Sequence, residues 1–178
     1  MEKINANGII YTKIFDKDII SKLPNELTDH KFKWVTGHWT AGRYNQPFNH
    51  YQLLIAEDYI LIANKLTQGN PNIHGHTWRR NTDNFGFSFM AMVNKDFPIT
   101  PKMIEIASKC LAIKKKKFNL NWSQFKDHNY WAEIDGYKGL RWDINLIYKD
   151  QESKNIGKSQ ETLLERLVRK GNWYLNKV

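Results

Sequence analysis

The chain has 178 residues, of which 41% are hydrophobic, and it carries 27 basic against 18 acidic residues, for a formal net charge of +9. This length fits one domain with a sizeable core and is short for two, while a single cysteine, Cys110, excludes an intramolecular disulfide and a secreted disulfide scaffold. The positive charge favours an anionic partner such as nucleic acid, a membrane surface or the acidic polymers of a bacterial wall.

The beginning of the chain and its hydropathy argue against export by a signal peptide and against a membrane span. Residues 1–5 show no basic region followed by an apolar run. No stretch approaches the roughly 18 apolar residues that a spanning helix needs. We therefore expect a protein made in a cytoplasm without a signal peptide.

Four segments have the pattern of core strands. Aromatic and β-branched residues from Phe32 to Trp39 predict a buried strand that runs up to His38. The apolar runs 51–55 and 59–63 are separated by three residues and predict a hairpin. The segment 85–93 carries little charge and predicts a further buried strand.

Helical signals dominate the second half of the chain. Thr100 and Pro101 offer a cap and a proline at the first helical position, and apolar residues then recur at helical spacing, which predicts a helix over 101–117. The lysine run 114–117 at its end has two readings, a nucleic-acid patch or a solvated helix end favoured by the helix dipole, and we favour the second. After a polar stretch, Ser159 is expected to cap a last helix, whose apolar face is Leu163, Leu164, Leu167 and Val168.

These elements predict a single α/β domain with a mixed central β-sheet flanked by helices. We expect an N-terminal extension over residues 1–30 and a catalytic domain over 31–148. Residues 149–178 are expected to form a linker and a C-terminal helix that packs on the domain.

Five of the six histidines lie near expected ends of elements and outside apolar stripes, at positions 38, 50, 74, 76 and 128. A lone histidine is more often structural than metal-ligating. The combination is what favours a polar site.

Four blocks of sequence resemble the zinc-dependent type 2 N-acetylmuramoyl-L-alanine amidases, the superfamily that includes bacteriophage amidase-type lysozymes and peptidoglycan recognition proteins. The blocks are His38–Gly42, His50–Ile55, His76–Phe87, and His128–Tyr137 together with Arg141–Asp143. They occur in the family's order between Val35 and Ile144. The resemblance implies the amidase fold, which agrees with the α/β domain expected from the pattern.

The resemblance implies that His38, His128 and Asp143 are the ligands of a Zn²⁺ ion. Two imidazoles and one carboxylate leave the fourth tetrahedral position open, as zinc-assisted hydrolysis requires, and keep the net charge of the site near +1. For Asp143 the alternative is a surface carboxylate paired with Arg141.

Four further site residues follow from the same resemblance. Tyr51 corresponds to a tyrosine beside the metal, with an ordinary strand aromatic as the alternative. Arg141 stands where phage-type relatives often carry lysine, a donor aimed at the developing oxyanion. His76 and Asn81 are expected to bind substrate.

The chain departs from the family pattern in ways that affect the mechanism. Other branches carry a catalytic glutamate where this chain has Ser88. Glu133 is a local candidate for the general base, although a surface carboxylate is the favoured reading. Trp78 and Arg79 stand where relatives favour small residues, so the cleft wall is expected to be bulkier and more basic.

The resemblance implies hydrolysis of the amide bond between N-acetylmuramic acid and L-alanine of the stem peptide. We expect a monomeric phage or prophage endolysin that acts on bacterial peptidoglycan, released through a membrane pore or carried by a virion. The alternatives are a non-catalytic peptidoglycan receptor of the same fold and a basic nucleic-acid-binding protein. The last is disfavoured because no reading motif accompanies the seven tryptophans.

Overall fold

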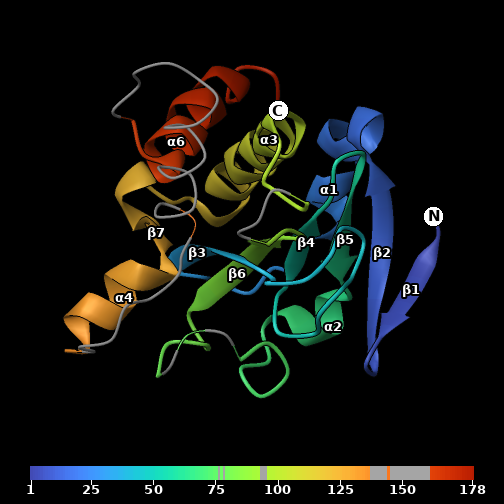
Figure 1. The fold of residues 1–178 in the computed structure, drawn as a ribbon, viewed down its shortest axis with the longest axis horizontal. Coiled ribbons are helices and arrows are strands. Elements are labelled where there is room, and N and C mark those ends of the chain that lie inside the picture. The colour runs from blue at the N-terminus through green and yellow to red at the C-terminus, as the bar shows by residue number, and fades with distance from the viewer. Residues whose placement is uncertain (76, 78, 93–95, 137–143, 145–160) are drawn as a thin grey trace.

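The computed structural model describes residues 1–75, 77, 79–92, 96–136, 144 and 161–178, and its centre is a mixed β-sheet (Figure 1). Within these residues the sheet has seven strands in the order β1-β2-β5-β4-β6-β3-β7. The strands are β1 (Lys3–Ala6), β2 (Ile9–Phe15), β3 (Trp34–Trp39), β4 (Leu53–Ile55), β5 (Tyr59–Ala63), β6 (Asn84–Phe89) and β7 (Phe125–Asp127). The expected single α/β domain with a mixed sheet is therefore confirmed.

The pairing of the strands changes from antiparallel to parallel across the sheet. Strands β1, β2, β5 and β4 pair antiparallel, whereas β4, β6, β3 and β7 pair parallel. In the parallel half, His38 of β3 lies opposite Ser88 of β6, and Gly37 lies opposite Asp127 of β7. Because parallel strands end at the same edge, the residues that follow β3, β6 and β7 meet there.

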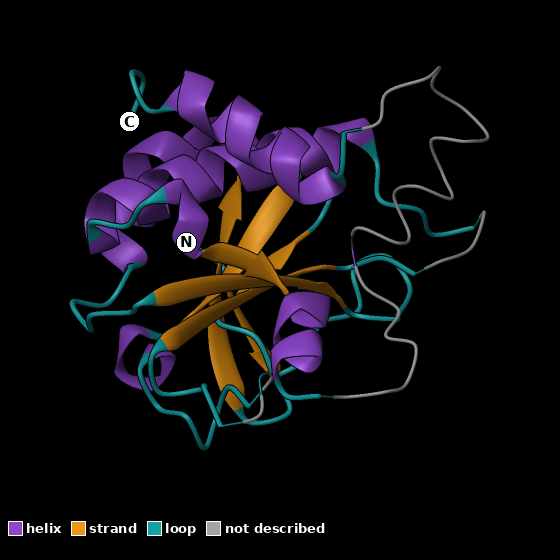
Figure 2. Ribbon diagram, turned by 90° about the vertical axis from the view of Figure 1, so that its left-hand side faces the viewer, coloured by secondary structure: helices purple, strands orange, loops and turns teal. Residues whose placement is uncertain are grey.

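Helices cover both faces of the sheet (Figure 2). The helices of the described residues are α1 (Ile19–Glu26), α2 (Lys65–Gln68), α3 (Pro101–Phe118), α4 (His128–Ile134) and α6 (Leu163–Tyr174). Helices α1, α3 and α6 share one face, and α2 and α4 lie on the other. None of the helices in the described part of the chain is long and apolar enough to span a membrane.

The larger core lies between α3 and the sheet. Thr100 Oγ1 accepts a hydrogen bond from the Met103 amide, Pro101 opens α3, and Asn119 ends it in the left-handed conformation with φ of 53°. The helix buries its apolar side against Phe85, Phe87 and Phe89 of β6, all fully buried. Each such ring stabilises the fold by about 1.5–3 kcal/mol.

The expected hairpin and the helix over 101–117 are present, with small shifts of the bounds. The expected first strand begins at Trp34 instead of Phe32, and the strand expected over 85–93 ends at Phe89. The last helix begins at Leu163, capped by Thr162 and not by Ser159, which lies outside the described residues. Thr162 is followed three residues later by Glu165, and the two form a capping box. Ser159 has no acidic residue three positions later and so could not form such a box.

The segment expected to be an N-terminal extension is part of the domain. Strand β2 pairs antiparallel with β5, Tyr11 opposite Ala63, and buries Tyr11 and Ile14 on opposite faces of the sheet. Helix α1 adds the fully buried Ile19 and Leu23 to the core under α3. Residues 1–30 therefore complete the antiparallel half of the sheet.

Candidate functional site

Two histidines meet at the carboxyl edge of the parallel strands. Gly37 of β3 pairs with Asp127 of β7. Each of these two residues is followed in the sequence by a histidine, His38 after Gly37 and His128 after Asp127. Their ring centroids lie 4.8 Å apart with the planes at 84°, and both residues are partly exposed. The structure thus brings together two of the three zinc ligands expected from the sequence.

Local structure explains why His128 lies there. A carboxylate oxygen of Asp127 accepts a hydrogen bond from the Tyr130 amide at 2.8 Å, so α4 starts directly after β7. On the neighbouring strand, a Cβ added to Gly37 would lie 2.6 Å from the Phe87 ring and 3.0 Å from Ile144 Cδ1. The absence of a side chain at Gly37 therefore lets Phe87 and Ile144 pack against β3 on the face opposite to the His38 side chain.

Tyr51 lies beside His38. Its hydroxyl is 3.0 Å from His38 Nδ1, and the two rings stack at 5.9 Å with 18° between planes. The same Nδ1 lies 2.5 Å from the carbonyl oxygen of Trp39. Because a carbonyl only accepts hydrogen bonds, this contact requires the proton of a neutral His38 ring on Nδ1 and leaves the lone pair on Nε2.

Tyr51 is held from the antiparallel half of the sheet. The Tyr11 hydroxyl of β2 donates to the carbonyl oxygen of Tyr51 at 2.7 Å and approaches that of Phe48 at 3.2 Å. Tyr11 is fully buried, and burial raises the pKa of its hydroxyl, so the hydroxyl remains a donor. Our reading of the sequence missed Tyr11, although the apolar residues around it in 9–15 gave a strand signal.

A buried polar network lies on the same face of β3, below His38. Trp131 Nε1 of α4 donates to Thr36 Oγ1 at 2.8 Å, and Thr36 Oγ1 donates to Asn84 Oδ1 at 2.9 Å. Asn84 Nδ2 in turn donates to Thr77 Oγ1 at 3.3 Å. The network fixes α4, which carries His128, against β3 and β6.

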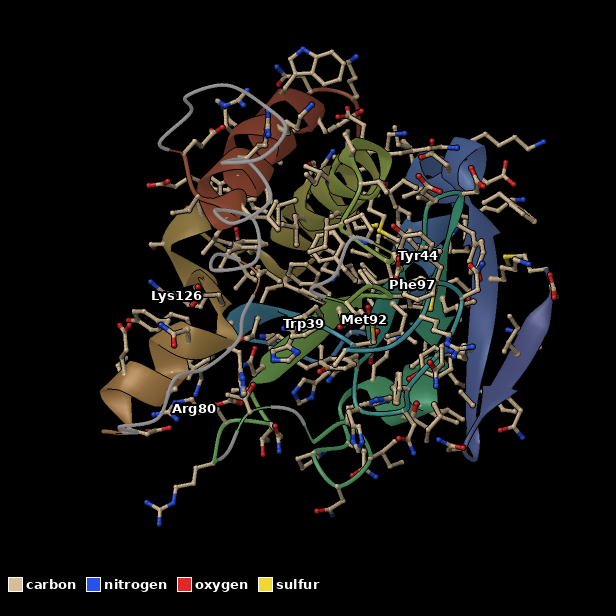
Figure 3. All side chains as sticks on the ribbon, viewed as in Figure 1. Trp39, Tyr44, Arg80, Met92, Phe97 and Lys126 are labelled. Carbon is tan, nitrogen blue, oxygen red and sulfur yellow. The ribbon has the colours of Figure 1, made fainter. Side chains whose placement is uncertain are left out.

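Arg80 ties the loop before β6 to the far end of α4. Its guanidinium makes two hydrogen bonds to Asp135, at 2.5 and 2.7 Å, and lies 4.7 Å from the Trp131 ring centroid. The hydrogen bonds to Asp135 raise the pKa of Arg80, and those from Arg80 lower the pKa of Asp135. Figure 3 shows Arg80 on the α4 side of the molecule, and nothing in the sequence alone had pointed to it.

Three other residues considered in the sequence analysis, Asn81, Ser88 and Glu133, lie in the described part of the structure. Asn81 Oδ1 accepts a hydrogen bond from the Thr77 amide at 2.7 Å and so braces its own loop. Ser88 is fully buried and in register with His38. Glu133, the local candidate for a general base, is exposed on α4 and accepts from Asn129 Nδ2 at 2.8 Å, as a surface carboxylate would.

Three expected site residues, His76, Arg141 and Asp143, lie outside the described residues, as does Trp78. Among the residues that are described, no group of three or more histidine, cysteine or acidic side chains is arranged to hold a metal ion. Ile144, which follows Asp143 directly in the sequence, is fully buried and packs beside Gly37.

Aromatic side chains flank the histidine pair. Trp39 stacks on His38 with centroids 6.5 Å apart and is partly exposed. Further along the same edge, Tyr44 contacts Phe97 at 5.3 Å, and its hydroxyl donates to the carbonyl of Pro98 at 2.5 Å. Figure 3 shows Trp39, Phe97 and Tyr44 across the front of the molecule.

In comparisons of the chain with protein-family models, with curated proteins and with solved structures, no match was found.

Proposed function

We propose that the protein is a zinc-dependent peptidoglycan hydrolase that cleaves the amide bond between N-acetylmuramic acid and L-alanine of the stem peptide. The observation that supports this most is the meeting of His38 and His128 at the carboxyl edge of adjacent parallel strands, with the Tyr51 hydroxyl beside them. The sequence resemblance to type 2 amidases implies the same two histidines as ligands.

The residues present suit a zinc ion. Metal-bound histidines usually donate the other ring N–H to a carbonyl or carboxylate, and His38 Nδ1 faces the Trp39 carbonyl in this way. The proposed third ligand, Asp143, is joined by one peptide bond to Ile144, which packs beside Gly37. Bound there, zinc would supply a Lewis acid for the amide carbonyl and lower the pKa of a coordinated water to about 7.

The protein's own groups would then position and stabilise the reacting amide. The Tyr51 hydroxyl can donate to the oxygen on which negative charge develops, and Arg141, being permanently protonated, would stabilise the same charge without shuttling protons. Ser88 offers a hydroxyl next to His38 where some relatives have a glutamate. It cannot replace that glutamate as a carboxylate base, so another group must carry the proton to the leaving amine.

The surroundings of the site would select a glycopeptide. Trp39 gives an aromatic surface on which a sugar ring can stack, and we assign His76 and Asn81 to the substrate groove. We propose peptidoglycan as the partner of a monomeric enzyme, consistent with a phage or prophage endolysin that acts on the bacterial wall.

The assignment is tested by metal content and hydrolysis measured on the same variants. His38→Ala, His128→Ala and Asp143→Ala are each expected to lower bound zinc and to abolish release of stem peptide from isolated walls, because each removes one ligand. His50→Ala, at an exposed histidine, is the matched control and should retain both. Full zinc occupancy in all three variants would contradict the proposed site, and zinc binding without hydrolysis in the wild type would favour a receptor.

A further inference from the structure

A pocket lies at the amino edge of β3, opposite the histidine pair. It is a pocket of about 520 Å³, between the loop that precedes β3 and the C-terminal end of α3, and we call it the amino-edge pocket. Its lining residues are Thr28, Asp29, His30, Lys31, Phe32, Lys33, Lys117, Phe118, Asn119, Leu120 and Gln124. Its volume lies within the roughly 300–1,000 Å³ range of small-molecule sites.

The charge of the amino-edge pocket is positive. Lys31, Lys33 and Lys117 line it against a single carboxylate, Asp29. Lys31 is exposed and makes no ion pair with any other described residue, whereas Lys33 pairs with Asp83 at 2.9 Å and Lys117 pairs with Asp29. Such exposed pairs contribute only about 0–1 kcal/mol, so these lysines can exchange their partners for a ligand.

The floor of the pocket is aromatic but offers no stacking platform. Phe32 is buried, and its ring meets that of Phe118 edge-on at 5.1 Å. A nucleic-acid groove presents several exposed ring faces to successive bases, whereas here Phe32 is buried and Phe118 alone is partly exposed. A sugar-phosphate unit, with its anion on the lysines and its carbon atoms on the exposed part of Phe118, matches this lining better.

We propose that the amino-edge pocket binds the phosphodiester polymer of a bacterial wall, through one repeat unit at a time, and so anchors the protein on its substrate. The proposal rests on the peptidoglycan-hydrolase function proposed above for its biological setting. It goes beyond that function by assigning attachment to the wall to a site other than the one that hydrolyses the amide. The pocket and the histidine pair lie at opposite ends of β3.

Binding of purified glycerol-phosphate polymer, stripped of peptidoglycan, tests the pocket without any turnover. The triple variant Lys31→Gln, Lys33→Gln, Lys117→Gln should bind the polymer more weakly. Its dissociation constant should rise about tenfold, equivalent to about 1.4 kcal/mol. The matched triple Lys17→Gln, Lys22→Gln, Lys102→Gln lowers the formal charge of +9 by the same three units, on exposed lysines outside the pocket. It should change the constant by less than about twofold, and an equal loss in both triples would overturn the proposal.

A pair of charge-neutralising variants tests the pocket in the opposite direction. Asp29→Asn removes the only carboxylate of the lining and frees Lys117, so polymer binding should tighten. Asp58→Asn removes another exposed carboxylate that pairs with a lysine, Lys102, at the other end of α3, and should leave binding unchanged. Weaker or unchanged binding in Asp29→Asn would count against the pocket.

Two further arms separate this proposal from its alternatives. Single-stranded DNA with the same number of phosphates should bind more weakly than the wall polymer, and tighter DNA binding that is lost in the pocket triple would overturn the choice of ligand. Hydrolysis of a small soluble muropeptide should be equal in the wild type and both triples. If no hydrolysis is found while the pocket variants behave as expected, the proposed enzyme function fails and the pocket stands.

Discussion

Lys114 lies fully buried on α3, with Nζ 4.1 Å from the ring centroid of Phe85 and 5.0 Å from that of Phe87. Its Nζ has no hydrogen-bond partner among the described residues. Burial lowers the pKa of this lysine to about 7, and the nearby Cys110 thiol opposes the shift only in part. The ring faces stabilise the ammonium but do not replace its lost hydration.

The depressed pKa of Lys114 makes the free energy of unfolding depend on pH. Between pH 7 and about 10.5 the unfolded chain binds a proton at this lysine and the folded chain does not, so stability rises with pH through that window and is lowest below it. Lys114→Met should therefore stabilise the protein by a few kcal/mol at pH 6, with an upper value on the order of 5, and much less at pH 10. Urea unfolding of both proteins at pH 6 and pH 10 measures the difference in stability. The control is Lys115→Met, at a lysine that is partly exposed. An equal gain at both pH values would show that the lysine is not the titrating group.

Strand β2 connects the antiparallel half of the sheet to the candidate site through Tyr11. Tyr11→Phe leaves the carbonyls of Tyr51 and Phe48 without this donor, which should cost about 1–3 kcal/mol of stability. If Tyr51 acts on the oxyanion, its displacement should also lower turnover by about tenfold to a hundredfold, with zinc content unchanged.

The control for this prediction is Tyr59→Phe on the neighbouring strand β5, which loses a hydrogen bond to Asn45 Oδ1 on the surface. It should leave turnover near the wild-type level. Turnover that falls in Tyr51→Phe but not in Tyr11→Phe would contradict a positioning role for β2.

The elements that the sequence predicted are those with a clean periodic pattern. Helix α3 has a cap, a first-turn proline and a regular apolar stripe. Strands β4 and β5 carry short apolar runs, and β3 and β6 are rich in aromatic residues. The pattern of β2 is interrupted by Lys13, and that of α1 by Pro24, so residues 1–30 read as an extension. Tertiary pairing with β5 overrides these weak local signals.

The candidate site divides in the same way. His38, His128 and Tyr51 stand in blocks that resemble a family, and they could be brought together on that ground. Thr36, Trp131 and Arg80 act through contacts between residues about 50 to 95 positions apart, as in the bonds of Arg80 to Asp135 and Trp131 to Thr36. No local period encodes such pairs, which explains why only the folded chain reveals them.

On the scale of the whole molecule, the amino-edge pocket and the histidine pair lie at opposite ends of β3. Lys33 precedes the strand and His38 lies near its end, five residues on, which at about 3.3 Å per residue is roughly 17 Å. That distance exceeds the Debye length of about 8 Å at physiological ionic strength, so the charge of the amino-edge pocket is largely screened from the histidine pair.

This separation predicts different salt responses for two substrates. If the positive charge holds the protein on the wall, added salt should slow the lysis of whole walls, because exposed charges are screened over about 8 Å at 0.15 M and about 3 Å at 1 M. Cleavage of a small soluble muropeptide should change little, since it depends on groups at the carboxyl edge. Turbidity of isolated walls and release of peptide from the muropeptide, followed over the same salt series, measure the two responses. Parallel losses on both substrates would place the salt-sensitive charge in the active site instead of on the attachment surface.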